Sequence, residues 1–238
     1  MKIALDIILV AVIAIAIWGG YKKGVIMGIG GVIVLIAAMV LGNAFSNAYS
    51  PEVITAMRPF VSGYTDKLLD EGVYAELGVE GSDYSVDDLL KQKPELNVSA
   101  SYRALKALGL SDDAAETVAM EAVKYSNENG IGLSEGLAET VCAKAAYVVG
   151  FLLFFLLAAI ILTVVGNLTN LSFRIPYLGR GNEIGGAIMG VAEGIILCMV
   201  FAWALRFMGI VFPDGLLQET IVADFFMKNN LLASYLGI

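Results

Sequence analysis

The sequence predicts an all-α integral membrane protein whose four transmembrane helices form two hairpins separated by a long helical segment. Hydrophobic residues make up 58% of the chain and charged residues 16%, whereas soluble domains have about 45–50% and about 25%. A small water-soluble fold could not bury such a surplus, because too much of its surface stays exposed. Four apolar windows and two similar glycine patterns lead to the same fold class.

The four windows approach the ~20 apolar residues that a helix needs to span a bilayer. They are residues 3–20, 24–42, 145–165 and 185–205. The second and third windows contain no charged residue, and the others contain one each, Asp6 and Glu193. We therefore expect four spanning helices.

The charges of the two short turns predict how the chain is threaded. The first turn carries Lys22 and Lys23, and the second carries Arg174 and Arg180. Counting helices puts both turns on one side of the membrane, and the bias of basic residues makes that side cytoplasmic. Both termini and the middle segment are then extracytoplasmic. No small-residue cleavage site precedes Lys22, so we expect the first helix to be retained rather than cleaved as a signal peptide.

We divide the chain into four parts. They are a first transmembrane hairpin at 1–42, an acidic helical extracytoplasmic insertion at 43–143, a second transmembrane hairpin at 144–210 and a C-terminal amphipathic, interfacial helix at 211–238. The insertion holds 17 acidic and 7 basic residues. In the last part, Leu217, Ile221 and Phe225 recur at four-residue spacing, which suits a helix lying in the interface or packed on the insertion.

Capping residues predict the helices of the insertion. Ser85 can begin a short helix, and Ser111 can cap a helix over residues 112–126 whose first turn is acidic. Gly130 is a plausible stop for that helix. Ser134 can begin a helix that runs straight into the third spanning window.

Two stretches of the chain resemble each other, GVIMGIGGVIVL at 24–35 and GAIMGVAEGIIL at 186–197. Lipid tails are as apolar as leucine, so helices associate in a membrane through close packing that small residues permit. The glycines expected to form these packing seams are Gly24, Gly28 and Gly31 in the second helix and Gly186, Gly190 and Gly194 in the fourth. The repetition predicts two glycine-zipper hairpins related by a pseudo-two-fold axis along the membrane normal. Helices two and four should be close neighbours, or each seam should receive an adjacent helix.

Glu193 is the charged residue of the fourth window. It lies about 12 Å along the helix from the start of the window, and it points within about 20° of Gly186, so it faces the packed seam. Its counterpart in the first copy is Gly31, which leaves space for a carboxylate. A charge at this depth by default indicates a functional site. The alternative is a neutral side chain that bonds a neighbouring helix, with Thr163 or Asn167 as partner.

The remaining polar residues indicate no catalytic site. Asp6 and Arg206 fall near the same membrane boundary and are candidates for an interhelical ion pair. The chain has no histidine, the commonest acid–base residue and metal ligand. Cys142 and Cys198 are expected to be small buried hydrophobes rather than a disulfide. We expect no enzyme activity, no cofactor, no metal and no nucleic-acid partner.

The chain resembles the colicin V production protein (CvpA) family of bacterial inner-membrane proteins. The resemblance rests on Asp6 and on two turn motifs, WGGYKKGV and GRGNEIGGAIMGVAEG. The matching positions are Gly20, Lys23 and Gly24 in the first turn, and Asn182, Gly186, Gly190 and Gly194 in the second. It covers both hairpins and leaves out the middle segment. Two positions depart from the family, because Glu183 and Glu193 stand where the family usually or frequently has a basic residue.

The resemblance implies an inner-membrane protein associated with production or export of a peptide toxin. With the packing seams, it favours a non-enzymatic scaffold in the lipid bilayer that acts through a membrane or envelope protein partner and forms homo-oligomers. The rival hypothesis is a small channel or transporter with Glu193 as a midplane carboxylate.

Overall fold

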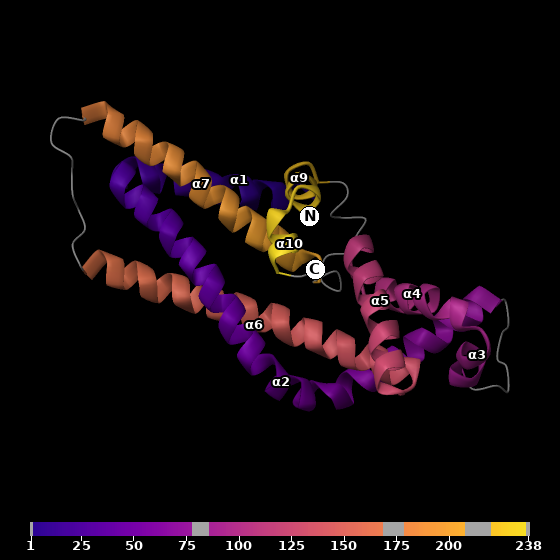
Figure 1. Cartoon of the computed structure of the whole chain (residues 1–238). Helices are drawn as coiled ribbons and strands as arrows, with labels where there is room; N and C mark the ends of the chain where they lie inside the picture. The colour runs from indigo at the N-terminus through magenta and orange to yellow at the C-terminus, as the bar shows by residue number, and fades with distance from the viewer. Residues whose placement is uncertain (1, 78–85, 169–178, 208–219, 237–238) are drawn as a thin grey trace. The chain divides into compact units, whose positions relative to one another are not determined.

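The computed structural model describes residues 2–77, 86–168, 179–207 and 220–236, and within these ranges the regular structure is helical. In chain order the elements are α1 (Lys2–Lys23), α2 (Val25–Leu77), α3 (Val86–Gln92), the 3-10 turn η1 (Pro94–Leu96), α4 (Asn97–Ala107), α5 (Asp112–Asn129), α6 (Leu133–Leu168), α7 (Gly179–Leu205), α9 (Val222–Lys228) and α10 (Leu231–Tyr235) (Figure 1). The all-α class predicted from the sequence is confirmed for these residues.

Four of the described helices are long and apolar enough to cross a membrane, as predicted. The candidate spans are Ala4–Lys23, Val25–Pro59, Leu133–Gly166 and Arg180–Leu205. The second and third are longer than the predicted windows, because their helices continue into the middle segment. Composition places a boundary after Gly42, but α2 runs on to Leu77 with Pro51 and Pro59 inside it.

The chain forms two compact units. Unit 1 comprises residues 1–46, 150–205 and 215–237, and unit 2 comprises residues 47–149, 206–214 and 238. Each unit therefore takes one part of α2 and one part of α6.

Unit 1 holds the four apolar helical stretches and the C-terminal helices. α1 lies alongside α7 (Figure 1). The largest buried side chain is Trp203, whose ring meets Phe151 of α6 edge-on at 5.0 Å between centroids. Large aliphatic side chains such as Ile15, Leu153 and Ile188 are exposed, which is the pattern of helices whose outer faces contact lipid.

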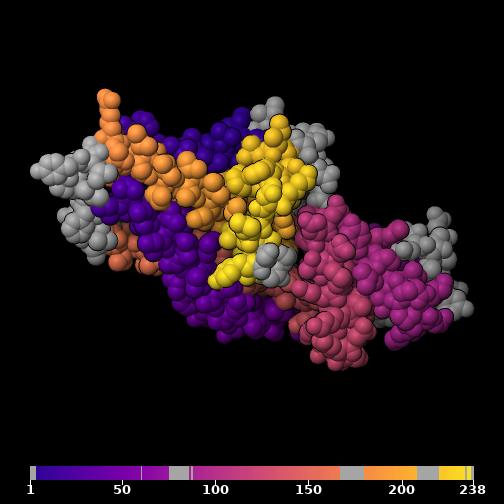
Figure 2. All heavy atoms as spheres, turned by 45° about the horizontal axis from the view of Figure 1, so that its top comes forward, coloured from indigo at the N-terminus to yellow at the C-terminus, as the bar shows by residue number. Residues whose placement is uncertain are grey.

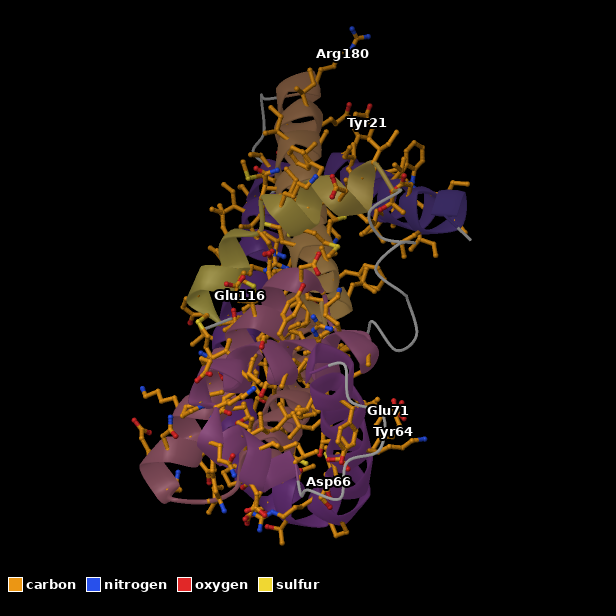
Figure 3. All side chains as sticks on the ribbon, turned by 90° about the vertical axis from the view of Figure 1, so that its right-hand side faces the viewer. Tyr21, Tyr64, Asp66, Glu71, Glu116 and Arg180 are labelled. Atoms are coloured by element: carbon orange, nitrogen blue, oxygen red, sulfur yellow. The ribbon has the colours of Figure 1, made fainter. Side chains whose placement is uncertain are left out.

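Unit 2 has its own hydrophobic core, centred on Leu69, Leu105, Val118 and Leu137. These four side chains come from α2, α4, α5 and α6, so one core joins helices that are distant in the sequence. The ion pair between Arg58 of α2 and Glu139 of α6, with nitrogen and oxygen 2.8 Å apart, adds a polar tie. The acid Asp66 of α2, labelled in Figure 3, accepts a hydrogen bond from Ser134 of α6.

The predicted capping residues delimit α5. The Ser111 hydroxyl accepts a hydrogen bond from the backbone N–H of Ala114, and Gly130 ends α5 with a φ of +64°. The start of α6 at Leu133 is one residue before the predicted Ser134. Ser85 lies outside the described residues, and α3 begins at Val86.

A hydrogen-bond group joins α4 to the start of α5. Asp112 accepts from the Tyr102 hydroxyl at 2.8 Å and pairs with the Lys106 ammonium at 3.1 Å. The hydrogen bonds from Tyr102 and from Lys106 hold the pKa of Asp112 below its usual value. The Asp112 side chain is 55% exposed, so solvent weakens this contribution.

The C-terminal part consists of two short helices where the sequence predicts one. Asn230 interrupts the helix: its backbone is extended, and its side chain caps α10 by accepting from the N–H of Leu232 at 3.0 Å. Its amide also donates to the carbonyl of Met199 at 2.9 Å, which attaches the break to α7. Figure 2 shows the two helices lying against α7. Ile221 and Phe225 are exposed, and Leu217 lies outside the described residues.

Candidate functional site

The glycines of α7 face α1 at backbone distance. A methyl group on Gly190 would lie 2.8 Å from the Cα atom of Ile17, and one on Gly194 would lie 3.0 Å from the Cα atom of Ile13. On Gly186 a methyl group would meet the carbonyl oxygen of Gly20. Ordinary Cβ contacts begin at 3.4 Å, so only glycine fits at this separation without moving one of the two helices. The α7 glycines predicted to form a seam therefore lie in a close helix contact.

The turn between α1 and α2 closes over the start of α7. Gly24 has a φ of +82°, a conformation that favours glycine. A side chain there would collide with Asn182, whose carboxamide carbon would be 2.8 Å away. The Asn182 oxygen accepts a hydrogen bond at 3.0 Å from the backbone N–H of Val25. Asn182 thus satisfies one of the N–H groups that the first turn of α2 leaves without an intrahelical partner.

The glycines of α2 face α7 on a side that adjoins the seam. A methyl group on Gly28 would lie 2.6 Å from the Cβ atom of Met189. One on Gly31 would meet the carboxylate of Glu193 and lie 2.7 Å from its carboxyl carbon. In the contact of α7 with α1, the glycines belong to α7. In the contact of α7 with α2, the glycines that face α7 belong to α2.

Glu193 occupies the space that the missing side chain of Gly31 leaves. Its Oε1 atom is buried and has no hydrogen-bond partner among the described residues. Thr163 is therefore no partner of Oε1, and the side chain of Asn167 lies outside the described residues. Among the described residues, Lys23 at the end of α1 attracts the carboxylate of Glu193 electrostatically. A buried carboxyl oxygen without a partner is unfavourable, and this makes Glu193 the candidate functional group of unit 1.

Polar and basic side chains gather where α1 ends and α7 begins. The Tyr21 hydroxyl donates to the carboxylate of Glu183 at 2.8 Å. The Lys22 ammonium lies over the ring of Trp18, 4.9 Å from its centroid, which is within the range of a cation–π interaction. Sequence reasoning used these residues for topology and for the family motif, and did not foresee the contacts.

Asp6 binds the C-terminal part of the chain. Its carboxylate accepts from the backbone N–H groups of Ile221, Val222 and Ala223 at 2.9, 3.0 and 3.2 Å. It thereby caps the start of α9, where the helix dipole favours a negative charge. Arg206 belongs to unit 2, and its pairing with Asp6 stays a prediction.

A second contact of small residues, which sequence reasoning missed, joins α2 to α6 within unit 1. A methyl group on Gly42 would lie 3.1 Å from the backbone nitrogen of Phe155, and one on Gly150 would lie 2.9 Å from the hydroxyl oxygen of Ser46. The phenyl rings of Phe45 and Phe154 lie beside this contact, 5.5 Å apart. The signal was present in the sequence, because Gly42 and Ser46 stand four residues apart.

The two cysteines carry no evident chemistry. Cys142 and Cys198 are free and buried, as the sequence predicts, and the Cys198 thiol lies 3.7 Å from the carbonyl oxygen of Leu9. Among the described residues there is no group of three or more histidine, cysteine, aspartate or glutamate side chains that could hold a metal ion.

Residues 122–231 match the family described as Colicin V production protein. The family resemblance is confirmed. The match includes α6, α7 and α9, and so it contains Asn182, Glu193 and the three glycines of the α7 seam. It differs in extent from the resemblance drawn from the motifs, because it begins within α5 and leaves out the first hairpin. No curated protein and no solved structure matches the chain. With its four candidate spans, the chain is a multi-pass membrane protein.

Proposed function

We propose that this protein is a non-enzymatic membrane scaffold that supports the production or export of a colicin V-like peptide toxin, or envelope assembly, through protein partners. The family match carries the link to toxin production. The close contacts of α7 with α1 and α2 support the scaffold. Such contacts hold helices in fixed positions, because backbones in van der Waals contact cannot slide or separate without losing the packing on which association in lipid depends.

The protein works in the bacterial inner membrane, with both termini and the segment at 43–143 outside the cytoplasm. The basic residues of the two turns support this orientation. An impermeant thiol reagent applied to intact cells tests it, with single cysteines introduced at Ser82 and Ser172 in a chain whose native cysteines are serines. Labelling at position 82 alone is the expected result, and labelling at position 172 alone reverses the topology.

Complementation tests the role in toxin production. In a bacterium that secretes a colicin V-type peptide, the resident family member is deleted and this chain is expressed in its place. We expect the released toxin, measured as the growth-inhibition zone, to be restored. The Gly190→Leu variant, which forces α1 and α7 apart, should fail to restore it, whereas Gly30→Leu should succeed, because nothing lies within 4 Å of a methyl group at Gly30. Absence of restoration by a chain that immunoblots find in the membrane would contradict the proposal.

The scaffold also requires a partner and favours self-association. Crosslinking in native membranes, followed by mild-detergent purification and quantitative mass spectrometry, should recover one membrane or envelope protein in a fixed ratio to the chain. With the Gly190→Leu variant, the partner should no longer be recovered in that fixed ratio. Recovery of the bare protein alone in repeated preparations argues against a scaffold.

A small channel or transporter is the second candidate, and the unpartnered Oε1 atom of Glu193 favours it. The close packing around that residue counts against a conducting path, since Gly194 beside it lies against the backbone of Ile13. Ion flux into proteoliposomes separates the two functions. Flux that disappears in Glu193→Gln supports a transporter, whereas a scaffold gives the same background as empty vesicles.

A further inference from the structure

An open, mainly apolar groove runs along α1 and α7 in unit 1. It is lined by Ala14, Ile17, Trp18, Tyr21 and Ala187. The small alanines on both helices leave the hollow, and the tryptophan and tyrosine form its end nearest the turn. All of these residues belong to candidate membrane spans, so the groove faces lipid rather than water.

The end of the groove lies at a membrane boundary. The Trp18 side chain is 62% exposed and the Tyr21 side chain 43% exposed, and these two residue types concentrate at the headgroup level of bilayers. The rest of the groove extends from this level toward the hydrocarbon. A molecule that fills it has an apolar chain below and a polar group beside Trp18.

Basic side chains surround that end of the groove. The Lys22 ammonium is held over the Trp18 ring at 4.9 Å, and Lys23 and Arg180 are exposed at the same end of unit 1. Figure 3 shows Arg180 at the tip of α7, beyond Tyr21, with its guanidinium directed away from the helix. The acid here, Glu183, accepts the hydrogen bond from Tyr21. Three cations thus stand against one carboxylate among the described residues of this end.

We propose that this groove is a binding site for an anionic glycerophospholipid. One acyl chain lies along Ala14, Ile17 and Ala187, and the phosphate binds the Lys22 ammonium beside Trp18. The ring occupies one side of the ammonium, which leaves its other N–H groups for phosphate oxygens. Lys23 and Arg180 add to the attraction, because basic clusters at the cytoplasmic end of membrane helices attract acidic lipid headgroups.

Charge complementarity favours this occupant over a second copy of the chain. A second copy docked through the same groove would bring a second set of three cations to the same boundary, and like charges there repel. A zwitterionic lipid fills the apolar part equally well but supplies no net charge. The proposal therefore predicts selectivity for headgroup charge at a site whose apolar part is not selective.

Quenching of Trp18 fluorescence by brominated lipids measures this selectivity directly. The full chain is reconstituted in mixed vesicles of phosphatidylcholine and phosphatidylglycerol in which one lipid at a time carries bromine on its acyl chains. Trp203 is fully buried and is replaced by phenylalanine in all variants, so that Trp18 is the reporter. We expect phosphatidylglycerol to bind about fivefold more strongly than phosphatidylcholine, since one cation near the surface contributes about that factor, and the preference should fall with added salt.

Four variants separate the headgroup contact from the groove. Lys22→Gln should remove most of the preference, because the phosphate binds this ammonium directly, and Lys22→Arg should keep it. Lys67→Gln removes an exposed cation of unit 2 and should change nothing. Ala187→Leu fills the groove and should weaken quenching by both lipids while leaving their ratio unchanged.

The proposal is overturned by equal affinities for the two lipids, or by a preference that Lys22→Gln leaves unchanged. Inorganic phosphate at millimolar concentration is the competing anion. If it abolishes the preference where sodium chloride of the same ionic strength does not, the cations recognise free phosphate and not a lipid. Chemical crosslinking in the same vesicles detects a second copy of the chain. If dimers are crosslinked at residues beside Trp18, and if neither brominated lipid then quenches Trp18, the groove is a site of self-association.

Discussion

Adding one methyl group to Gly190 tests the central contact of the membrane unit. In Gly190→Ala the new Cβ atom would lie 2.8 Å from the Cα atom of Ile17, and 2.9 Å from the carbonyl carbon of Ala16. The carbonyl oxygen of Ala16 lies closer still, and ordinary contacts begin at 3.4 Å, so α1 and α7 must separate by more than about 0.6 Å at this level. The atoms in the way belong to the backbone and cannot rotate aside.

The expected cost follows from two opposing effects. Overpacking of this kind costs about 1–3 kcal/mol, and replacing a helical glycine by alanine returns about 0.5–1 kcal/mol. Gly190→Ala should therefore lower the free energy of unfolding by about 1–2 kcal/mol. Gly30→Ala is the matched control. Nothing lies within 4 Å of its new methyl group, so this variant should only gain the stability that alanine has over glycine in a helix.

Unfolding by sodium dodecyl sulfate in mixed micelles measures the difference through the fluorescence of Trp203, which is fully buried in the native unit. The two variants should differ by about 2 kcal/mol, or about thirtyfold in the equilibrium constant for unfolding. Equal stabilities would show that the two helices do not meet through their backbones at Gly190, and the reasoning about the seam would be wrong.

Three further predictions concern single contacts. Gly31→Ala should lower the free energy of unfolding by about 1 kcal/mol in the wild-type chain and by almost nothing in a Glu193→Ala background, because the new methyl group meets only the flexible carboxylate. If the effects of the two substitutions simply add in a double-mutant cycle, that contact is refuted. Asn182→Ala should lower the free energy of unfolding by about 0.5–2 kcal/mol through loss of the acceptor for the N–H of Val25, whereas Asn182→Asp, which keeps an acceptor oxygen, should cost less. Asp112→Asn should lower the free energy of unfolding by about 0.5 kcal/mol at pH 7. The difference from wild type should vanish as the pH falls below about 4, because hydrogen bonds from α4 lower the pKa of the native Asp112 and their benefit is lost once this carboxylate is protonated. A stability difference that persists at low pH, measured by circular dichroism, would contradict this.

The parts of the fold that sequence reasoning predicted depend on local chemistry. Hydropathy over a window reports whether a segment prefers lipid, whatever it packs against, and it located all four spans. Capping is equally local, and Ser111 and Gly130 delimit α5 as predicted. The prediction of a single C-terminal helix differs from the structure, which has two short helices there. Apolar residues occur on both sides of Asn230, but the side chain of Asn230 donates a hydrogen bond to the carbonyl of Met199, a partner that no local pattern reveals.

The pairing of the glycines could not be predicted for a different reason. Spacing fixes which face of a helix is bare, but it does not say which neighbour approaches that face. A methyl group on Gly190 of α7 would meet the backbone of α1, and one on Gly28 of α2 would meet Met189 of α7. The length of α2 was underestimated because its apolar window ends at Gly42, whereas the helix itself continues past Pro51 to Leu77.

The contacts of unit 1 also show how two hairpins can share one packing scheme. α1 lies on α7 through Gly190, and α6 lies on α2 through Gly42 and Gly150. The first helix of each hairpin thus packs on the second helix of the other. This exchange is what a two-fold relation between the hairpins requires, although duplication of the sequence itself stays a prediction. The two exchanged contacts lie at different positions along their helices, so any such symmetry is approximate.

The same scheme explains why only one copy of the repeated pattern carries a carboxylate. α7 has helices on two sides, and the side toward α2 is open at Gly31, where the carboxylate of Glu193 lies. A glutamate at position 31 as well would put two carboxyl groups in the space of one, where two negative charges repel strongly in a medium of low dielectric constant. Glycine at position 31 is therefore the complement of glutamate at position 193, and the two copies differ because one helix supplies the side chain and the other supplies the space.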